Sequence, residues 1–330
     1  MGDGGSFGAK EVDLSVIIPH YDSADTLDRL LGTIPQRENL QVIVVDDRSS
    51  EAEREKLRAL SEKYPHAEFC SNDRERKGAG TCRNIGIERA KGKWLVFADA
   101  DDYFLPGMYD VLSASFGSSS DIVFFVPESV KLPSGTPGDR HRMFETAVMM
   151  YIEDPSFANY IRMKSSIGNT TPVAKMIRAS LVRKHRIRYS EILQANDVMF
   201  WTKAGYHAGS ASAVPEHIYC ITDSDGSMTH DMTWENYRIR INEHIRVCRF
   251  CVKHYPPEEP RYVHAVSINN VAGVLMRGFG VRRALSVYRK YRKYRVPLFT
   301  EETIKLMLFR RGFFRGGHGK RKGSFPRDGV

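Results

Sequence analysis

The sequence is poor in cysteine, and its five cysteines have no spacing that would build a disulfide framework. Their number is odd, and only Cys248 and Cys251 lie close enough to form a CxxC motif. A zinc site of this kind needs a second pair, so two buried neighbours in a helix-like stretch are the better interpretation. We therefore expect the chain to fold in a reducing cytoplasm.

Long apolar runs are also absent. No segment of the sequence approaches the roughly 20 apolar residues that cross a bilayer, and the N-terminus has no basic segment followed by an apolar one, as a secretory signal would have. A cytoplasmic location is the expectation that follows. The chain of 330 residues is 42% hydrophobic and 27% charged, which is an ordinary balance for a globular protein.

Acidic residues are scarce in the C-terminal part of the chain. Residues 277–330 contain sixteen Lys or Arg and three acids, a local charge of +13, whereas the whole chain carries +9. In VRRALSVYRKYRKYRV (281–296), a helix would have one basic face and one face of Val, Leu and Tyr. Residues 277–322 would then suit an anionic membrane surface, with the protein peripheral on the inner face of the cytoplasmic membrane. The alternative is a solvated basic face whose tyrosines pack against the catalytic domain.

Apolar runs alternate with helical patterns in the first hundred residues. Strands are predicted at 14–19, 40–47, 67–71 and 93–99, and helices at 24–34, from Ser49 and Ser50 through EAEREKLRALSEKY, and at 80–92. Strands with nearly continuous apolar runs, each followed by a helix, indicate a parallel sheet covered on both faces. The predicted fold class is therefore α/β and Rossmann-like, with a mostly parallel sheet.

Polar residues follow three of these predicted strands: Pro19-His20-Tyr21, Asp46-Asp47-Arg48 and Asp99 to Asp102. Each group alone is more simply explained as a turn or a cap. The carboxyl ends of parallel strands meet at one edge of a sheet, however, and ligands bind there. Carboxylates at the edge of a core are costly unless a cation or hydrogen-bond donors meet them. Three such groups at one edge favour a nucleotide site with a divalent metal.

The segments LSVIIPHYDSADTLDRLL, VIVVDDRSSE and KGAGTCRNIGIERAKGKWLVFADADDYFLPG resemble, in order and spacing, the N-terminal half of family 2 glycosyltransferases. The resemblance covers roughly residues 13 to 110 and implies the GT-A fold. It also implies that Asp47 contacts the nucleobase of a nucleotide-sugar. The segment Pro19, His20 and Tyr21 would contribute to nucleotide binding, with Pro19 and Tyr21 packing against the base.

In this resemblance DADD supplies the DxD motif, whose acids touch the ribose and bind the Mn²⁺ or Mg²⁺ that bridges the diphosphate. Asp99 and Asp101 form the literal DxD and are predicted nucleotide contacts. Asp101 and Asp102 are the predicted metal ligands, and the sequence leaves open which acid holds the ion.

Arg83 and Asn84 match the RN pair that the family has in the helix before the DxD strand. Arg83 would lie near the nucleotide, where a guanidinium meets phosphate or base, or the pair would hold the helix to the sheet. Both interpretations stay open. The GAG at 78–80 lacks the GK[ST] ending of a phosphate loop, so a flexible turn is the better interpretation.

Transfer to a hydroxyl needs a general base. Asn196-Asp197 heads a helix-like run within residues 190–205, where an ordinary helix cap is the simpler explanation. The run also resembles the ED-type motif of the family, whose Asp is the catalytic base, and here ND stands in place of ED. We therefore predict Asp197 as the base.

The segment HIYCITDSDGSMTHD (217–231) predicts a strand followed by a polar loop. Related enzymes often order such a loop over the diphosphate, and some take a metal ligand from it. This makes His230 a predicted metal ligand and His217 a further candidate. Surface histidines are the simpler alternative.

These features divide the chain into a disordered start (1–12), a GT-A catalytic domain (13–232), a helical basic extension (233–314) and a disordered tail (315–330). Within the catalytic domain, residues 13–130 would bind the nucleotide-sugar and 131–232 the acceptor. The Gly- and Pro-rich residues 131–142 predict a mobile loop near the acceptor side.

The resemblance implies an inverting reaction, in which a hydroxyl deprotonated by Asp197 displaces the nucleoside diphosphate. The QxxRW motif and spanning helices of processive synthases are absent, which favours addition of one or a few sugars, with a UDP-sugar as the default donor. The acceptor would be a glycan or a polyprenyl-linked intermediate of polysaccharide assembly. Nucleic-acid binding through the basic helices is an alternative without a recognition motif. A sugar nucleotidyltransferase would need a Gly- and Arg-rich phosphate loop where IIPHYDS stands.

Overall fold

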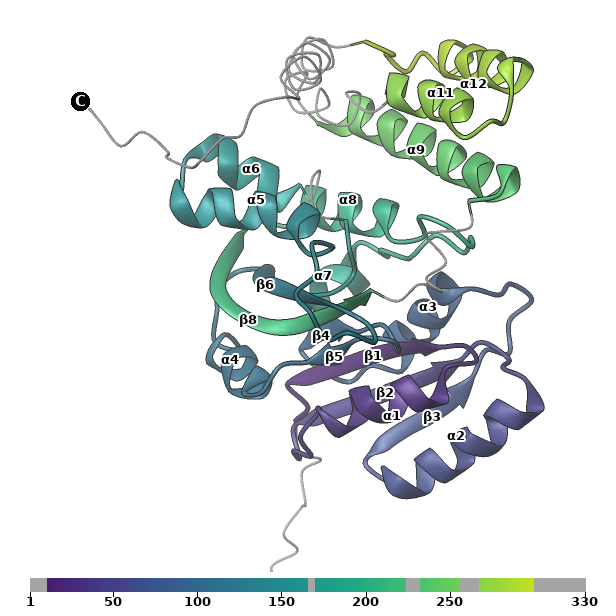
Figure 1. Cartoon of the computed structure of the whole chain (residues 1–330). Coiled ribbons are helices and arrows are strands. Elements are labelled where there is room, and N and C mark those ends of the chain that lie inside the picture. Colours follow the sequence, from purple (N-terminus) through teal and green to yellow (C-terminus); the bar gives the residue numbers. More distant parts are fainter. Residues whose placement is uncertain (1–10, 166–169, 224–231, 256–266, 300–330) are drawn as a thin grey trace, which may run out of the picture. The chain divides into compact units, whose positions relative to one another are not determined.

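The structure is a computed structural model that describes residues 11–165, 170–223, 232–255 and 267–299 (Figure 1). Most of the predicted disordered start, residues 300–314 of the predicted helical extension and the tail 315–330 lie outside the described residues. The chain divides into two compact units, residues 1–247 and 248–330.

An eight-stranded sheet forms the centre of the first unit, in the order β3-β2-β1-β4-β7-β6-β8-β5. β1, β2, β3 and β4 are parallel, as predicted, while β7 runs antiparallel to β4 and to β6, and β8 is parallel to β6 and antiparallel to β5. The strands are β1 Leu14–His20, β2 Leu40–Asp46, β3 Ala67–Ser71, β4 Trp94–Phe97, β5 Tyr103–Phe104, β6 Ile122–Lys131, β7 Lys175–Arg178 and β8 Ala211–Asp223.

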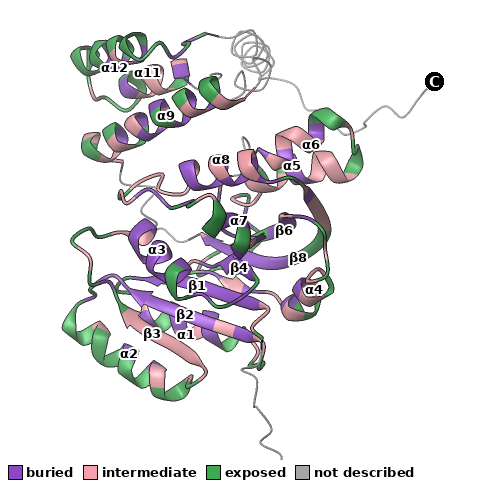
Figure 2. Cartoon of the chain, turned by 180° about the vertical axis from the view of Figure 1, so that it is seen from behind, coloured by how far each residue is buried: buried purple, intermediate pink, exposed green. Residues whose placement is uncertain are grey.

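Helices cover both faces of this sheet because its strands are apolar on both sides. In β1, Val16 and Ile18 belong to one apolar cluster with Leu27 of α1, whereas Ile17 belongs to a second cluster with Ile85 of α3. Figure 2 shows these central strands as buried. The helices of this unit are α1 Ala24–Gly32, α2 Glu51–Lys63, α3 Ala79–Arg89, α4 Met108–Ala114, α5 Arg142–Glu153, α6 Phe157–Lys164, α7 Ala179–Lys184 and α8 Val198–His207.

The helix α3 packs unusually closely against its neighbours because two of its residues are glycines. A Cβ added to Gly86 would lie 2.3 Å from the Ile17 side chain, and one added to Gly80 would lie 2.3 Å from the Ser190 carbonyl oxygen. The helix therefore lies directly between β1 and the segment 189–196, and all residues from Gly80 to Ile87 are buried.

The boundary between the units falls within α9, Trp234–His254, although the predicted extension begins at residue 233. The first part of α9 belongs to the first unit, where buried Glu243 accepts a hydrogen bond from the Ser190 hydroxyl at 2.5 Å. Cys248 and Cys251 are both buried in α9, as expected for two core neighbours.

The second unit contains a pair of helices, α11 Ser267–Met276 and α12 Val281–Lys293. The Asn270 amide donates to the Tyr291 hydroxyl at 2.9 Å and links them. Among the described residues, no helix is long and apolar enough to span a membrane.

Candidate active site

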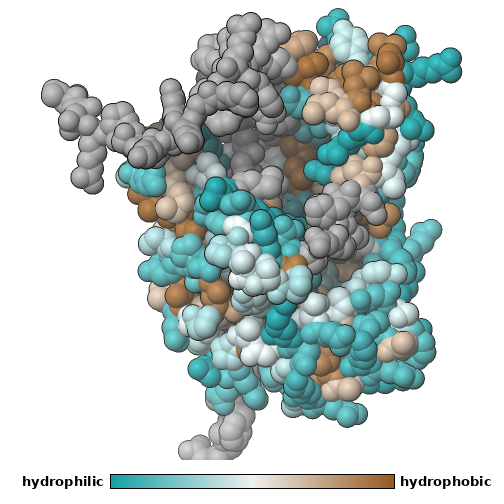
Figure 3. Space-filling model, viewed as in Figure 1, coloured by the Kyte–Doolittle hydropathy of each residue, from teal (hydrophilic) through white to brown (hydrophobic). Residues whose placement is uncertain are grey.

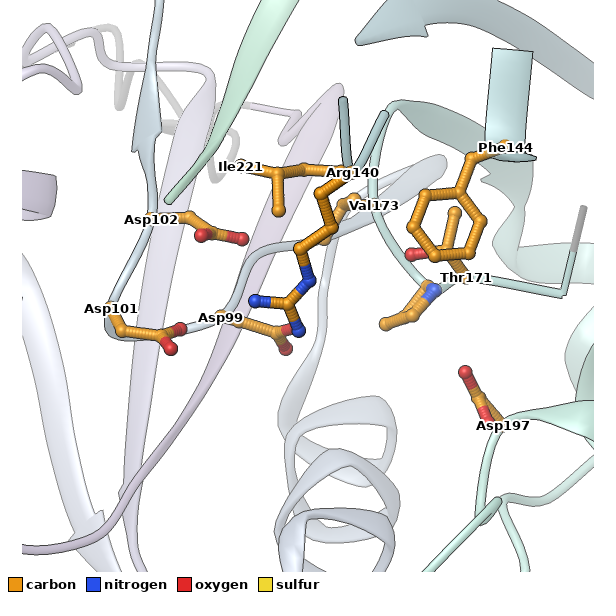
Figure 4. A pocket seen from close by; sticks show the side chains of 10 residues that line it. Asp99, Asp101, Asp102, Arg140, Phe144, Thr171, Val173, Asp197 and Ile221 are labelled. Atoms are coloured by element: carbon orange, nitrogen blue, oxygen red, sulfur yellow. The ribbon is translucent and has the colours of Figure 1, made fainter. Parts of the chain in front are cut away.

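A pocket of about 180 Å³ lies where the loop after β4 meets the end of β8 and the start of α8 (Figure 4). It brings four of the predicted site residues together from two distant parts of the chain. The lining residues are Asp99, Asp101, Asp102, Arg140, Phe144, Thr171, Pro172, Val173, Asp197 and Ile221.

His20 lies at the end of β1 and is buried. Its Nε2 accepts a hydrogen bond from the Ser23 N–H at 3.2 Å, so the ring proton is assigned to Nδ1, which lies 3.1 Å from a carboxylate oxygen of Asp46. Both ring nitrogens are therefore used within the protein, and the ring holds β1 to β2. The His20 side chain therefore has no donor or acceptor left for the predicted contact with a nucleotide.

Asp47 is buried directly after β2, and both of its carboxylate oxygens accept hydrogen bonds. Oδ1 accepts from the Asn72 amide and Oδ2 from the Gly78 N–H, each at 2.6 Å. The GAG segment predicted as a turn is the start of α3, with Gly78 at φ 119° in the N-cap position. Asp47 thus anchors the loop between β3 and α3.

Pro19 and Tyr21 lie beside this anchor in different environments. Pro19 is buried in β1, whereas Tyr21 is 55% exposed, with the Lys77 ammonium 5.1 Å from its ring centroid. Of the two, Tyr21 presents an aromatic surface on which a nucleobase could stack.

The DxD acids have different environments. Asp99 accepts a hydrogen bond from the Arg83 guanidinium, while Asp101 is exposed. Asp102 is buried, and its Oδ1 accepts from the Thr222 N–H at 2.8 Å. Burial and the neighbouring charges of Asp101 and Asp99 raise the pKa of Asp102 well above its usual range. Although Asp101 is exposed as a residue, protein atoms around its carboxyl group displace part of the surrounding water, and this desolvation together with the charge of Asp99 raises its pKa. Among the described residues, no basic side chain is hydrogen-bonded to the carboxylates of Asp101 and Asp102, so a bound cation would stabilise them.

A preformed metal site is not evident in the part of the chain that the structure describes, since no group of three or more metal-binding side chains converges there. His230 lies outside the described residues. His217 lies on β8, 3.7 Å from a carboxylate oxygen of Glu128, and does not line the pocket.

Arg83 connects the two ends of the candidate site. Its buried guanidinium donates to Asp99, to the Asn196 side-chain carbonyl at 2.8 Å, and lies 5.2 Å from the Tyr189 ring centroid. Asn84 instead bonds the Tyr189 backbone on both sides, donating at 3.0 Å and accepting at 2.9 Å. Asn84 therefore holds α3 to the segment 189–196, and Arg83 holds that segment to the DxD loop.

Asp197 occupies the N-cap position of α8, but its side chain makes no capping hydrogen bond. In Figure 4 the carboxylate instead points toward the pocket. Burial raises the pKa of this carboxyl group against the opposing effect of Arg83, and Asp99 raises it further. A carboxylate with a raised pKa accepts a proton more readily than an ordinary aspartate does.

Three residues of the site were not found from the sequence. Arg140 lines the pocket, and Thr222 bonds both Asp101 and Asp102. Lys175 is fully buried, and its ammonium donates at 2.8 Å to the carbonyl of Thr171, which lines the pocket. Burial lowers the pKa of Lys175 well below the usual value, although the charge of Asp197 opposes this effect. The position of this lysine inside the apolar run PVAKMI was the one available sequence signal, because lysines are rarely fully buried.

Comparison with known proteins adds independent information. Residues 15–186, slightly more than half of the chain, match the family model described as glycosyl transferase family 2. The chain is 27% identical over 216 residues to the uncharacterized glycosyltransferase YibD of Escherichia coli, covering 62% of this chain and 60% of that protein. It is 26% identical over 212 residues to the poly(ribitol-phosphate) beta-glucosyltransferase of Bacillus spizizenii, covering 62% and 31%. The chain spans less than two thirds of the length of these relatives.

Two solved structures share the fold. TarS of Staphylococcus aureus, in complex with UDP-GlcNAc, matches with a TM-score of 0.56 at 19% identity, covering 84% of both chains. The mannosyltransferase PcManGT from Pyrobaculum calidifontis, in complex with GDP-Man and Mn²⁺, matches with a TM-score of 0.52 at 16% identity, covering 93% of this chain and 82% of that one. The predicted GT-A architecture is confirmed, and with the match over residues 15–186 the chain belongs to glycosyltransferase family 2.

Proposed function

We propose that this protein is a metal-dependent, inverting glycosyltransferase that moves a sugar from a nucleotide-sugar to a hydroxyl group. The main support is one observation: the DxD acids and Asp197 line a single pocket, although they come from distant parts of the sequence. An acid cluster suited to a cation and a carboxylate suited to a base are the two groups that such a reaction requires.

The proposed donor is a UDP-sugar. Tyr21 would stack on the base, Asp47 would accept from it, and Asp99 and Asp101 would contact the ribose and diphosphate. The exposure of Tyr21 and the position of Asp47 at the end of β2 support this arrangement. TarS, with which this chain shares its fold, binds UDP-GlcNAc, whereas PcManGT binds GDP-Man. The nucleobase of the donor is therefore to be identified by experiment.

The residues present fit a divalent ion. Asp101 is exposed and Asp102 is held in place by Thr222, so both would supply the hard oxygen ligands that Mn²⁺ and Mg²⁺ prefer. His230 stays a predicted additional ligand. A bound ion would neutralise charge on the departing diphosphate.

In the proposed mechanism, Asp197 accepts the proton of the acceptor hydroxyl as its oxygen attacks the anomeric carbon. The bond to the diphosphate breaks on the opposite face of the sugar, so the anomeric configuration inverts without a covalent intermediate. Arg83 would keep Asp197 and the DxD loop in register, because it bonds both Asp99 and Asn196.

The proposed acceptor is a glycan or polyprenyl-linked intermediate of polysaccharide assembly, reached from the cytoplasmic side of the membrane. The support comes from α12, where Val281, Leu285 and Tyr288 are exposed at helical spacing beside arginines. Figure 3 shows apolar and polar residues side by side on the surface of the second unit. Such a surface suits an anionic bilayer.

Calorimetric titration of the full chain with UDP, GDP, dTDP and CMP, with and without Mn²⁺, tests this proposal. We expect one nucleotide to bind in a metal-dependent manner, and Asp101→Ala to abolish that binding. Asp110→Ala is the matched control, since Asp110 is exposed on α4. Absence of binding by every nucleotide would contradict the proposal.

A further inference from the structure

Arg140 is a cationic side chain inside a pocket otherwise lined by acidic and neutral residues. Among the described residues that line the pocket, it is the one with a positive charge. In Figure 4 its side chain extends into the pocket, and its guanidinium points toward the DxD acids. The positive charge of Arg140 lowers the pKa of Asp101, although desolvation of that carboxyl group and the charge of Asp99 outweigh this effect.

Backbone and side-chain hydrogen bonds hold the segment that carries Arg140. The Gly138 N–H donates to the Ser129 carbonyl of β6 at 2.8 Å, and the Ser129 hydroxyl lies 2.7 Å from Nδ1 of His141. A Cβ on Gly138 would lie 2.9 Å from that hydroxyl oxygen. Residues 132–141, which lie within the predicted mobile loop at 131–142, thus fold back on β6 and carry Arg140 to the pocket.

Thr222 joins Arg140 to the acid cluster. Its N–H donates to Asp102 at 2.8 Å, its hydroxyl to the Asp101 carbonyl at 2.7 Å, and its own carbonyl accepts from Nη1 of Arg140 at 3.0 Å. This is the sole hydrogen bond that the structure gives to the Arg140 guanidinium within its described residues. Its other N–H groups are left for a ligand.

The other arginines near the acids are already committed. Arg83 is bonded to Asp99 and Asn196, and Arg29 donates to the Asp101 carbonyl and lies 5.3 Å from the Tyr103 ring centroid. A substrate that brings phosphate into a pocket of four carboxylates needs positive charge beyond that of one divalent ion. A planar guanidinium with free donors matches a phosphoryl group in shape and charge.

We propose that Arg140 binds a phosphoryl group of the substrate in this pocket. The inference rests on the proposed function. It adds to the divalent ion a second positive group that binds substrate, the Arg140 guanidinium from the acceptor half of the domain. The phosphoryl group would be the diphosphate of the donor or a phosphate of the acceptor, which present the same chemistry to the guanidinium.

Calorimetry on the full chain separates these sources. The ligands are UDP with Mn²⁺, uridine, and glycerol phosphate in the presence of UDP and Mn²⁺. If a nucleotide with another base binds instead, its nucleoside diphosphate replaces UDP and its nucleoside replaces uridine. The variants are Arg140→Gln, Arg140→Lys and the control Arg142→Gln, which removes the same charge from an exposed residue that pairs with Asp139.

If the donor supplies the phosphoryl group, Arg140→Gln lowers UDP affinity about tenfold or more and leaves uridine binding unchanged. If the acceptor supplies it, UDP affinity is unchanged and glycerol phosphate binding is lost. In either case Arg140→Lys, which keeps the positive charge but not the planar pair of N–H donors, gives an intermediate loss of affinity. Arg142→Gln binds both ligands as the wild type does.

Thermal unfolding of each variant checks that it folds, and Arg140→Lys serves should the glutamine variant fail to do so. Equal affinities of wild type and Arg140 variants for UDP and glycerol phosphate would overturn the inference while leaving the proposed function intact. A wild type that binds none of the nucleotides would overturn the proposed function and the inference with it.

Discussion

Asp197 lies at the start of a helix, but its side chain does not cap that helix. This leaves its carboxylate free of the helix N–H groups and determines its chemistry. A carboxylate at an N-cap usually accepts from the first turn of its helix, which stabilises its charge. The Asp197 side chain makes no such bond and lines the pocket, so its carboxylate is available to a substrate proton.

Asp197→Asn should therefore lower kcat by about 100- to 10,000-fold, the usual contribution of a general base. Nucleotide affinity should change little, because Asp197 contacts the acceptor side of the reaction in this account. Steady-state kinetics with calorimetry on the same samples make the test, with Asp110→Asn as control. A kcat within a few-fold of wild type would exclude Asp197 as the base.

The pH dependence of kcat should report the ionisation of Asp197. Burial raises its pKa above the ordinary value of an aspartate, with the charge of Asp99 acting in the same direction and those of Arg83 and Lys175 opposing. A general base acts when ionised, so kcat should fall as the pH decreases through this raised pKa. A pH–rate profile should place the acidic limb above the range of an ordinary aspartate. A profile that stays flat down to that range would contradict the assignment.

Single residues also show what could be read from the sequence. The acids Asp99, Asp101, Asp102 and Asp197 are predicted from the DxD and ED-type motifs that the sequence resembles, since their places after a strand or at a helix start alone favour a turn or a cap. The structure places all four around one pocket. Arg140 and Thr222 could not be found, since they reach the pocket through the return of a loop onto β6 and through strand pairing over long sequence separations.

At the scale of elements, α3 determines how closely the DxD loop and the segment 189–196 approach. Gly80→Ala should destabilise the fold by about 1–3 kcal/mol, because the new Cβ would lie 2.3 Å from the Ser190 carbonyl oxygen. This cost should exceed the gain in helix propensity of about 1 kcal/mol. Denaturant unfolding measures the change, and kcat should fall as the bond from Arg83 to Asn196 is displaced.

Gly117→Ala is the matched control for that prediction, because a Cβ at Gly117 meets no atom within 4 Å. The free energy of unfolding of this variant should stay near that of the wild type. Equal stability of the Gly80 and Gly117 variants would show that the contact of α3 with residues 189–196 does not constrain the site.

The amphipathic helix α12 should bind anionic vesicles. Arg282→Glu combined with Arg289→Glu should weaken co-sedimentation with phosphatidylglycerol vesicles at least tenfold, because each basic residue contributes about 1 kcal/mol near such a surface. Arg54→Glu with Arg58→Glu, a pair of exposed residues on α2, is the control. Equal sedimentation of the wild type with neutral and anionic vesicles would reject the membrane surface.

The predicted elements were most accurate where one local pattern governs them. The strands at 14–19, 40–47 and 67–71 and the helix from Glu51 agree closely with β1, β2, β3 and α2. The helix predicted at 80–92 ends earlier, at Arg89, since Gly92 lies against the Ser15 backbone instead of closing the helix. The position of β7 between β4 and β6 depends on tertiary contacts, so no local sequence pattern predicts it.

At the scale of the whole molecule, the proposed reaction depends on one geometric feature of the catalytic domain. The two halves of the catalytic domain contribute to a single pocket, with the DxD acids from the first half and Asp197 and Arg140 from the second. In the proposed mechanism the first half would supply the cation site and the second half the base. The described structure therefore supports one reaction centre shared by the two halves.

A crystal structure of the protein with its nucleotide-sugar and Mn²⁺ tests this claim most directly. We predict that the ion lies on Asp101 and Asp102, and that the anomeric carbon faces Asp197 with room between them for the acceptor hydroxyl. A sugar directed away from Asp197, or an ion bound without the DxD acids, would contradict the account.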